Sequence, residues 1–154
     1  MHCRILKLVF LVFLPLLPAY ITAQVFYVLP DGGVEVNEVE IPEEENPFLF
    51  VFNVLSNPPD PYLKLLPENA FRAVYVVKDT LYLDFYGEKF EGYSFDDYRY
   101  LIHSLLATVF NSFEGINWVK FLIDGRDDVP LGGVIEITYM FSKEVWKKWP
   151  IQIP

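Results

Sequence analysis

The amino-acid sequence predicts an α+β domain with two layers, in which two helices pack on one face of a mostly antiparallel sheet. Two pairs of β-prone runs are each separated by a short turn, which is the pattern of antiparallel hairpins. One segment, residues 94–113, repeats its apolar side chains at the three- and four-residue spacing of a helix. The 154 residues suffice for one domain with a substantial core, and no internal repeat divides them.

The first 23 residues resemble a secretory signal peptide. Arg4 and Lys7 precede an apolar run over residues 8–21, and small residues follow it up to Ala23. This run of about fourteen residues contains two prolines and is shorter than the roughly 20 residues that a spanning helix needs. We therefore expect cleavage near Ala23 and a single mature domain with a short C-terminal tail over residues 24–154, with an uncleaved anchor as the alternative.

Charge and cysteine content argue against several classes of function. Without Arg4 and Lys7 the chain has 10 basic and 21 acidic side chains, a net charge of −11. Because Lys and Arg contacts to phosphate dominate nucleic-acid affinity, such an acidic chain without a basic stripe is not expected to bind nucleic acid. The one cysteine, Cys3, precedes the apolar run, so we expect no lipid anchor on it and no disulfide or thiolate metal site in the mature chain.

The first predicted element of the mature chain is a hairpin. Residues 25–29 are aromatic and β-branched, and Pro30-Asp31-Gly32-Gly33 then supplies the residues of a tight turn. A second strand is expected over residues 34–41. Its alternation of apolar and polar residues slips at Asn37-Glu38, where we expect a β-bulge.

A short helix is expected next. The three consecutive glutamates at 43–45 form a solvated approach to it, Asn46 is suited to the N-cap, and Pro47 is suited to the first helical position. The helix then covers residues 48–55. Four prolines follow over residues 57–67, a segment that we interpret as an ordered loop because it is too short and too apolar to link two domains.

A second hairpin is predicted from the strands at residues 71–77 and 80–85, which flank Lys78-Asp79. In its second strand the odd-numbered positions 81, 83 and 85 are apolar and share one face. Tyr82 and Asp84 share the other face, which is expected to point away from the helices.

The best-defined element is a long helix. Ser94, with Asp97 three residues later, resembles a capping box. Its apolar stripe consists of Tyr98, Leu101, Ile102, Leu105, Leu106, Val109 and Phe113. Gly115 is expected to end the helix as the C′ residue.

A strand over residues 119–123, a turn at residues 124–128 and a last strand over residues 134–141 complete the prediction.

These motifs, in this order, resemble the GerMN family of sporulation and spore germination proteins over about residues 25–141. The similar segments are VFYVLPDGG, LPENAFRAVYVVKDTLYLDF, the long helix with its closing glycine and the strand that follows, and LGGVIEITYMF. The resemblance implies an extracytoplasmic, non-catalytic module used in envelope or spore-associated assemblies. It implies no catalytic residue and no cofactor.

Few residues point to catalysis or metal binding. His103 is the one histidine after the leader and lies off the apolar stripe, so we expect an exposed helical side chain rather than a catalytic base. No nucleophile motif of the G-x-S-x-G type is present. Asp124, Asp127 and Asp128 could hold a hard cation, but their spacing differs from that of a calcium loop, and a polar turn is the expected arrangement.

Two further patterns have the residue types of a functional site. Asp84 with Glu88 or Glu91 could form the carboxylate pair of a glycan hydrolase, although acids are so frequent in this chain that the pattern has little specificity. The double-glycine motifs at residues 31–33 and 131–133 lack phosphate-loop spacing and precede strands, so we interpret them as turns.

We therefore expect an exported, non-catalytic GerMN-like protein, secreted, periplasmic or attached to the cell envelope, that binds an envelope protein or itself. The expected contact surface is the sheet face opposite the helices, where Tyr82 and Glu136 should point, or an exposed edge strand. The alternatives are an envelope enzyme acting on glycan or peptide through carboxylates, and a calcium-dependent binding module.

Membrane contact would involve an uncleaved leader or the tail Trp146-Lys147-Lys148-Trp149, although packing of Trp146 on the domain is favoured.

Overall fold

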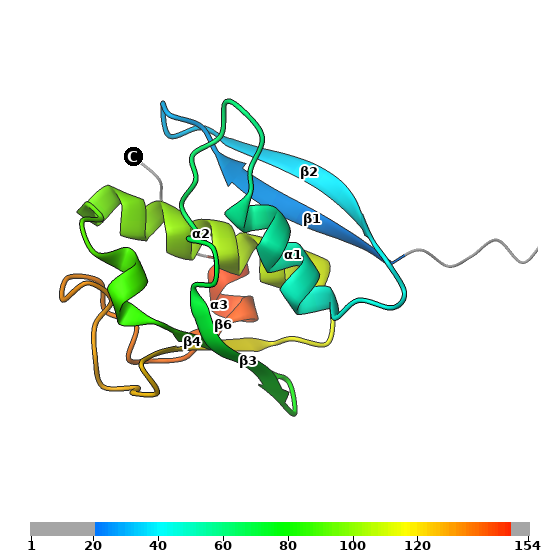
Figure 1. The fold of residues 1–154 in the computed structure, drawn as a ribbon. Coiled ribbons are helices and arrows are strands. Elements are labelled where there is room, and N and C mark those ends of the chain that lie inside the picture. Colours follow the sequence, from blue (N-terminus) through cyan, green and yellow to red (C-terminus); the bar gives the residue numbers. More distant parts are fainter. Residues whose placement is uncertain (1–20, 149–154) are drawn as a thin grey trace, which may run out of the picture.

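Two sheets enclose a layer of helices in the computed structural model, which describes residues 21–148 (Figure 1). The smaller sheet is the antiparallel hairpin of β1 (Ile21–Val28) and β2 (Val34–Ile41). The larger sheet has the order β3-β4-β5-β6. Its strands are β3 (Phe71–Val77), β4 (Thr80–Phe85), β5 (Trp118–Ile123) and β6 (Phe141–Ser142). The helices are α1 (Pro47–Ser56), α2 (Phe95–Ser112), α3 (Lys143–Lys148) and the short 3₁₀ helix η1 (Gly87–Phe90).

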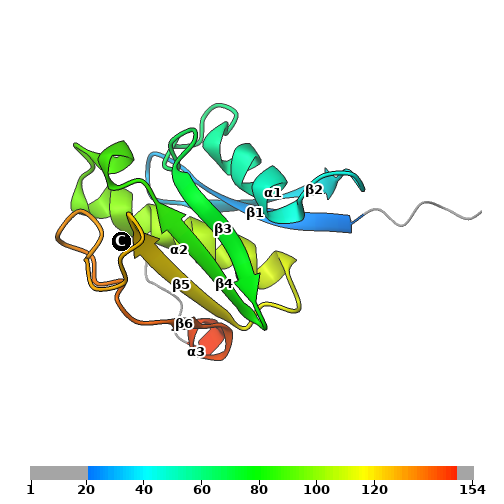
Figure 2. The same ribbon diagram turned by 60° about the horizontal axis from the view of Figure 1, so that its bottom comes forward.

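The predicted α+β class is confirmed. Helices α1 and α2 cover one face of the larger sheet, and the opposite face of that sheet is turned outward (Figure 2). Strand pairing is antiparallel except between β4 and β5, which are parallel because η1 and α2 cross over between them. The arrangement differs from the expectation in one respect, since β1 and β2 form a separate sheet on the far side of the helices (Figure 1).

The first hairpin forms as predicted, but the predicted bulge is wrong. The pairing runs without interruption from Ile21↔Ile41 to Val28↔Val34, through Asn37 opposite Val25. Most of β2 is solvent-exposed, so both faces of the strand accept polar side chains. The break in the apolar and polar alternation at Asn37-Glu38 therefore requires no β-bulge. The turn closes with a hydrogen bond from the Leu29 amide to the Gly33 carbonyl, 2.8 Å long.

The predicted leader overlaps β1. Residues 1–20 lie outside the described part of the chain, whereas Ile21, Thr22 and Ala23 are the first three residues of the strand. Ala23 is buried in the core and pairs with Val39. Cleavage after Ala23 would therefore remove three paired residues from β1, whereas cleavage before Ile21 would leave the strand whole.

Helix α1 begins as the sequence predicts. The Asn46 side chain accepts hydrogen bonds from the amides of Phe48 and Leu49, both 3.1 Å long, and Pro47 is the first helical residue. The glutamates at 43–45 are exposed, as expected of a solvated approach. The following loop is ordered by burial of its Leu65 and Leu66 side chains.

Helix α2 begins with the predicted capping box, in which Ser94 and Asp97 bond reciprocally. The predicted C′ glycine is wrong. The helix ends at a C-cap on Phe113, and Gly115 does not adopt a positive φ. The Lys143 ammonium instead donates to the carbonyls of Phe113 and Glu114, at 3.3 and 3.4 Å, so a distant lysine bonds the C-cap residue and the residue that follows it.

The predicted last strand over residues 134–141 is also wrong, since just Phe141 and Ser142 pair with β5. The chain turns at Gly132 and Gly133, both at positive φ, and an isolated bridge joins Leu131 to Ile135. The Glu136 carboxylate then accepts hydrogen bonds from the Thr138 amide and hydroxyl. These local bonds compete with strand pairing and bend the chain away from the sheet.

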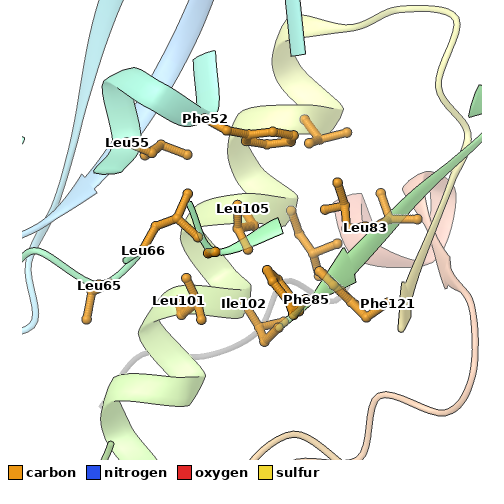
Figure 3. Close-up of a cluster of buried hydrophobic side chains, with 14 of the residues drawn as sticks. Phe52, Leu55, Leu65, Leu66, Leu83, Phe85, Leu101, Ile102, Leu105 and Phe121 are labelled. Atoms are coloured by element: carbon orange, nitrogen blue, oxygen red, sulfur yellow. The ribbon is translucent and has the colours of Figure 1, made fainter. Parts of the chain in front are cut away.

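The core fills the space between α1, α2 and the larger sheet (Figure 3). Leu83 and Phe85 of β4 and Phe121 of β5 face the predicted apolar stripe of α2. Phe85 lies at the centre of an aromatic cluster, with its ring centroid 5.0 Å from those of Phe71 and Phe90 and 5.8 Å from that of Phe121. This packing accounts for the predicted alternation along β4.

The free edge of β1 is covered by hydroxyl groups of α2. Thr108 accepts from the Phe26 amide at 3.1 Å, Ser104 donates to the Phe26 carbonyl at 2.5 Å, and Ser112 bonds both the amide and the carbonyl of Gln24. The three hydroxyl residues are spaced four apart, so they lie along one side of the helix. They take the place of a neighbouring strand.

Replacing Thr108 with valine should lower the free energy of unfolding by about 1–3 kcal/mol, because the partly buried Phe26 amide loses its acceptor, the hydroxyl of the fully buried Thr108, while the side-chain shape is kept. Urea unfolding monitored by circular dichroism measures this loss. Ser112→Ala is the matched control, and it should cost less because water can reach the exposed Gln24 backbone. Equal losses for the two variants would contradict the role given to the buried bond.

Candidate functional site

Four strands have a side that no other strand occupies within residues 21–148: β1, β2, β3 and β6. An unpaired strand edge offers its amides and carbonyls to other chains, and proteins usually protect such edges. The hydroxyl groups of α2 protect β1. Strand β2 carries exposed Glu35, Glu38 and Glu40, and β6 has two residues. None of these three edges is an open template for another strand.

The edge of β3 has no comparable protection. Tyr75, Val76 and Val77 follow one another and are 43%, 41% and 50% exposed. Between Arg72 and Lys78 the strand carries no charged side chain and no proline. Because β3 lies at the outer edge of the sheet, these side chains reach solvent on both of its faces, whereas β4 beside it is buried except at Tyr82. This strand is therefore the candidate interaction site.

The outer face of the sheet beside β3 is aromatic. Tyr75 and Tyr82 are paired across the two strands, and their rings stack with centroids 4.9 Å apart and planes inclined by 3°. Tyr82 thus points to the face opposite the helices, as predicted. Glu136 was expected on the same face as part of a strand, but it lies in the irregular segment before β6, where its carboxylate is bonded to Thr138.

Asp84 lies on this outer face and is buried. Its carboxylate accepts from the Gly125 amide at 2.9 Å and from the Arg72 guanidinium at 3.1 Å. Both oxygens therefore hold backbone and side chain in place at the end of β4. Glu88 and Glu91, its suggested partners in a hydrolase pair, are exposed. The contacts of Asp84 are those of a structural carboxylate.

The aspartates after β5 form a turn, as predicted. Asp124 has φ 51° and accepts from the Gly87 amide at 3.3 Å. Asp128 pairs with Arg126 at 3.1 Å, and this hydrogen bond lowers the pKa of the Asp128 carboxyl. Within residues 21–148 no three His, Cys, Asp or Glu side chains are grouped in a way that could hold a metal ion.

His103 is half-buried, whereas an exposed side chain was expected. Trp146 of α3 covers it, with ring centroids 6.2 Å apart, and also packs 5.8 Å from Phe110. Packing of Trp146 on the domain is therefore confirmed. Helix α3 itself was not predicted, and this explains the difference at His103. Trp149, the end of the predicted tail motif, lies outside the described residues.

Comparison with known families now identifies the fold. A family model described as Germane, sporulation and spore germination, matches residues 24–129. The chain belongs to this family. The match extends from β1 to the end of the turn after β5, so it includes the β3–β4 hairpin. It confirms the GerMN resemblance found in the sequence motifs.

A solved structure has a similar fold. It is the crystal structure of a candidate lipoprotein from Clostridium perfringens, which shares 17% sequence identity with the Germane chain at a TM-score of 0.54. The alignment covers 81% of this chain and 89% of that one. No curated protein compared with the chain matches it. Within residues 21–148 no helix is long and apolar enough to cross a bilayer.

Sequence reasoning named an edge strand as a contact surface but did not say which one. The run Val74 to Val77 does not identify the strand, because four consecutive apolar residues next to a turn are typical of a strand that is buried on both faces. What the sequence could not show is that β1, β2 and β6 are protected or short. That comparison depends on the sheet order and on the contacts of α2.

Proposed function

We propose that this Germane-family chain is a non-catalytic binding or assembly module that works outside the cytoplasm, in the cell envelope. Its partner is another protein, or a second copy of the chain, that pairs with the outer edge of β3. The observation that carries this proposal is the exposed, uncharged run Tyr75-Val76-Val77, which lies on the one long strand edge without protection within residues 21–148.

Strand addition fits the chemistry of this edge. Backbone amides and carbonyls of β3 would supply hydrogen bonds to an added strand, and Val76 on one face and Tyr75 and Val77 on the other would supply apolar contact. The Tyr75–Tyr82 stack extends that contact onto the outer face of the sheet. Neither face offers a nucleophile or an acid–base pair, which favours binding over catalysis.

The proposed location rests on three observations. The family is associated with sporulation and germination. The similar solved structure is described as a candidate lipoprotein, a class of envelope protein. The first 23 residues have the order of charge, apolar run and small residues found in secretory signals. A role in sporulation or germination assemblies is the corresponding functional proposal.

The substitution Val76→Lys should abolish partner capture, because an ammonium group on the edge would be desolvated by an incoming strand. Pull-down from envelope extract, with partners identified by mass spectrometry, should show recovery lowered by about tenfold or more. Sedimentation velocity over a wide concentration range tests self-association in the same way.

Val36→Lys is the matched control, since Val36 is similarly exposed but lies on the acidic edge of β2. It should leave capture and self-association unchanged. Two results would reject the proposal: retention of the partner by Val76→Lys, or a wild-type chain that stays monomeric and recovers no specific protein.

A further inference from the structure

A second site lies beside the β3–β4 turn, where a hollow of about 460 Å³ opens between three segments that are far apart in the sequence. The segments are the turn itself, the start of β5 and the junction of β6 with α3. The lining residues are Asp79, Asn117, Trp118, Ser142, Lys143, Glu144 and Lys147. Its volume is in the range of small-molecule sites.

Hydrogen bonds hold the walls of this hollow in place. The Asp79 carbonyl accepts from the amides of Asn117 and Trp118, at 2.9 and 3.2 Å, and the Asp79 carboxylate accepts from the Asn117 side-chain amide at 3.1 Å. The Lys143 amide donates to the Asn117 carbonyl at 2.8 Å. All three segments are thus tied together, so the polar groups are positioned before any ligand arrives.

Trp118 forms an apolar wall within this polar site. It is 39% exposed although its backbone lies in a strand of the sheet. A second, more apolar hollow of about 370 Å³ adjoins the first, because Trp118 and Ser142 line both. The indole is therefore flanked by a polar and an apolar surface.

We propose that this hollow binds a saccharide, with one pyranose ring packed on the Trp118 indole. A sugar ring has an apolar CH face and a rim of hydroxyl groups, so it needs a flat apolar surface bordered by both acceptors and donors. Asp79 and Asn117 supply acceptors and Lys147 supplies donors, whereas the Lys143 ammonium already donates to the carbonyls of Phe113 and Glu114. A sugar acetamido methyl group would suit the neighbouring apolar hollow.

Charge indicates which saccharides bind best. Glu144 is engaged by Lys148 at 2.8 Å, and the Lys143 ammonium donates to the carbonyls of Phe113 and Glu114, which leaves Lys147 as the cation that can meet a ligand carboxylate. Burial, and then the nearby charge of Lys147, lowers the pKa of the Lys143 ammonium. A ligand carboxylate would relieve this repulsion, so an amino-sugar chain with carboxylates, the chemistry of cell-wall glycan, is the expected class.

A membrane surface is the other occupant that an aromatic and basic site could take, and the lining argues against it. The carboxylates of Asp79 and Glu144 line the same hollow as the lysines. The apolar phase of a membrane would have to desolvate these carboxylates. The hydroxyl groups of a sugar can instead donate hydrogen bonds to the carboxylates and accept them from the lysines.

The test uses the full chain and two soluble probes. One is neutral chitotetraose, and the other is the corresponding tetrasaccharide with lactyl carboxylates on alternate sugars. Binding is followed by ¹H–¹⁵N spectra at millimolar sugar, with calorimetry for affinity. We expect both probes to shift the resonances of Asn117 and Trp118, and the carboxylated one to bind about fivefold more tightly or better.

Trp118→Leu keeps an apolar side chain but removes the flat ring, and it should weaken both probes by about tenfold. Lys147→Gln should remove the preference for the carboxylated probe without affecting chitotetraose. Tyr75→Ala, on the same sheet face but outside the hollow, is the control and should change neither.

The proposal is overturned if neither sugar shifts these resonances, if Trp118→Leu binds as well as the wild type, or if the chain binds phospholipid vesicles and no sugar. Loss of protein capture in Val76→Lys with sugar binding intact would show that the two sites are separate. A negative result in the sugar-binding test therefore leaves the proposed protein contact at β3 open, and a negative result in the capture test leaves the proposed saccharide site open.

Discussion

Replacing Phe85 with alanine should lower the free energy of unfolding by about 3–5 kcal/mol. Phe85 is fully buried and contacts the rings of Phe71, Phe90 and Phe121. It joins the edge strand, the connection into α2 and the central strand β5. The surrounding rings come from three different elements and are rigid, so they cannot collapse into the space that the lost ring leaves.

Phe95→Ala is the control for this experiment. It is the same chemical change at a residue that is 53% exposed, where the ring lies 5.7 Å from the Arg99 guanidinium. Its cost should stay below about 1 kcal/mol. Urea unfolding curves, from which the free energy of unfolding and its slope m are obtained, measure both variants. A loss of less than 1 kcal/mol for Phe85→Ala would mean that the aromatic cluster is not the centre of the core.

Local signals predicted most of the elements because they act within a few residues. Asn46 before Pro47, and Ser94 with Asp97, fix the starts of α1 and α2 through bonds to the nearest amides. The alternation of Leu81, Leu83 and Phe85 fixes the buried face of β4. Each of these signals acts between residues that are close in the sequence, so it does not depend on how distant parts of the chain pack.

The wrong predictions share a different cause. Gly115 is not needed at positive φ because the chain leaves α2 at Phe113 in an extended conformation, and Lys143, 30 residues away, donates to the Phe113 carbonyl. The strand expected over residues 134–141 is replaced by a bend in which Glu136 bonds to Thr138. In both cases a side chain, not a neighbouring strand or a glycine, satisfies the backbone, and sequence periodicity contains no sign of it.

The two candidate sites depend on the same kind of information. The β3 edge is distinctive because the edge of β1 is covered by hydroxyl groups of α2. The residues that make these hydrogen bonds are separated by 78 positions in one case and by 88 in another. The hollow at Trp118 combines Asp79, Asn117 and Lys143, which no local motif connects. The sequence could name aromatic and charged residues, but it could not say which of them share a surface.

Gly132→Ala should be the second strongly destabilising change, with a cost of about 2–4 kcal/mol. Gly132 has φ 59°, and a β-carbon added to it would overlap the phenol ring of Tyr98 near its hydroxyl group. That ring cannot move aside easily, because Tyr98 is buried and its hydroxyl donates to the Phe90 carbonyl at 2.9 Å. The variant must therefore move the segment that connects β5 to β6 away from α2.

Gly133→Ala separates the two causes, since Gly133 has φ 73° but an added β-carbon would meet no atom within 4 Å. It should cost about 1–2 kcal/mol from backbone strain alone. In a Tyr98→Leu background the cost of Gly132→Ala should fall to that of Gly133→Ala, because the clash is gone while the strain remains. If the cost does not fall, Tyr98 is not the obstacle. Because the displaced segment leads into β6 and α3, Gly132→Ala should also weaken saccharide binding, whereas Gly133→Ala should not.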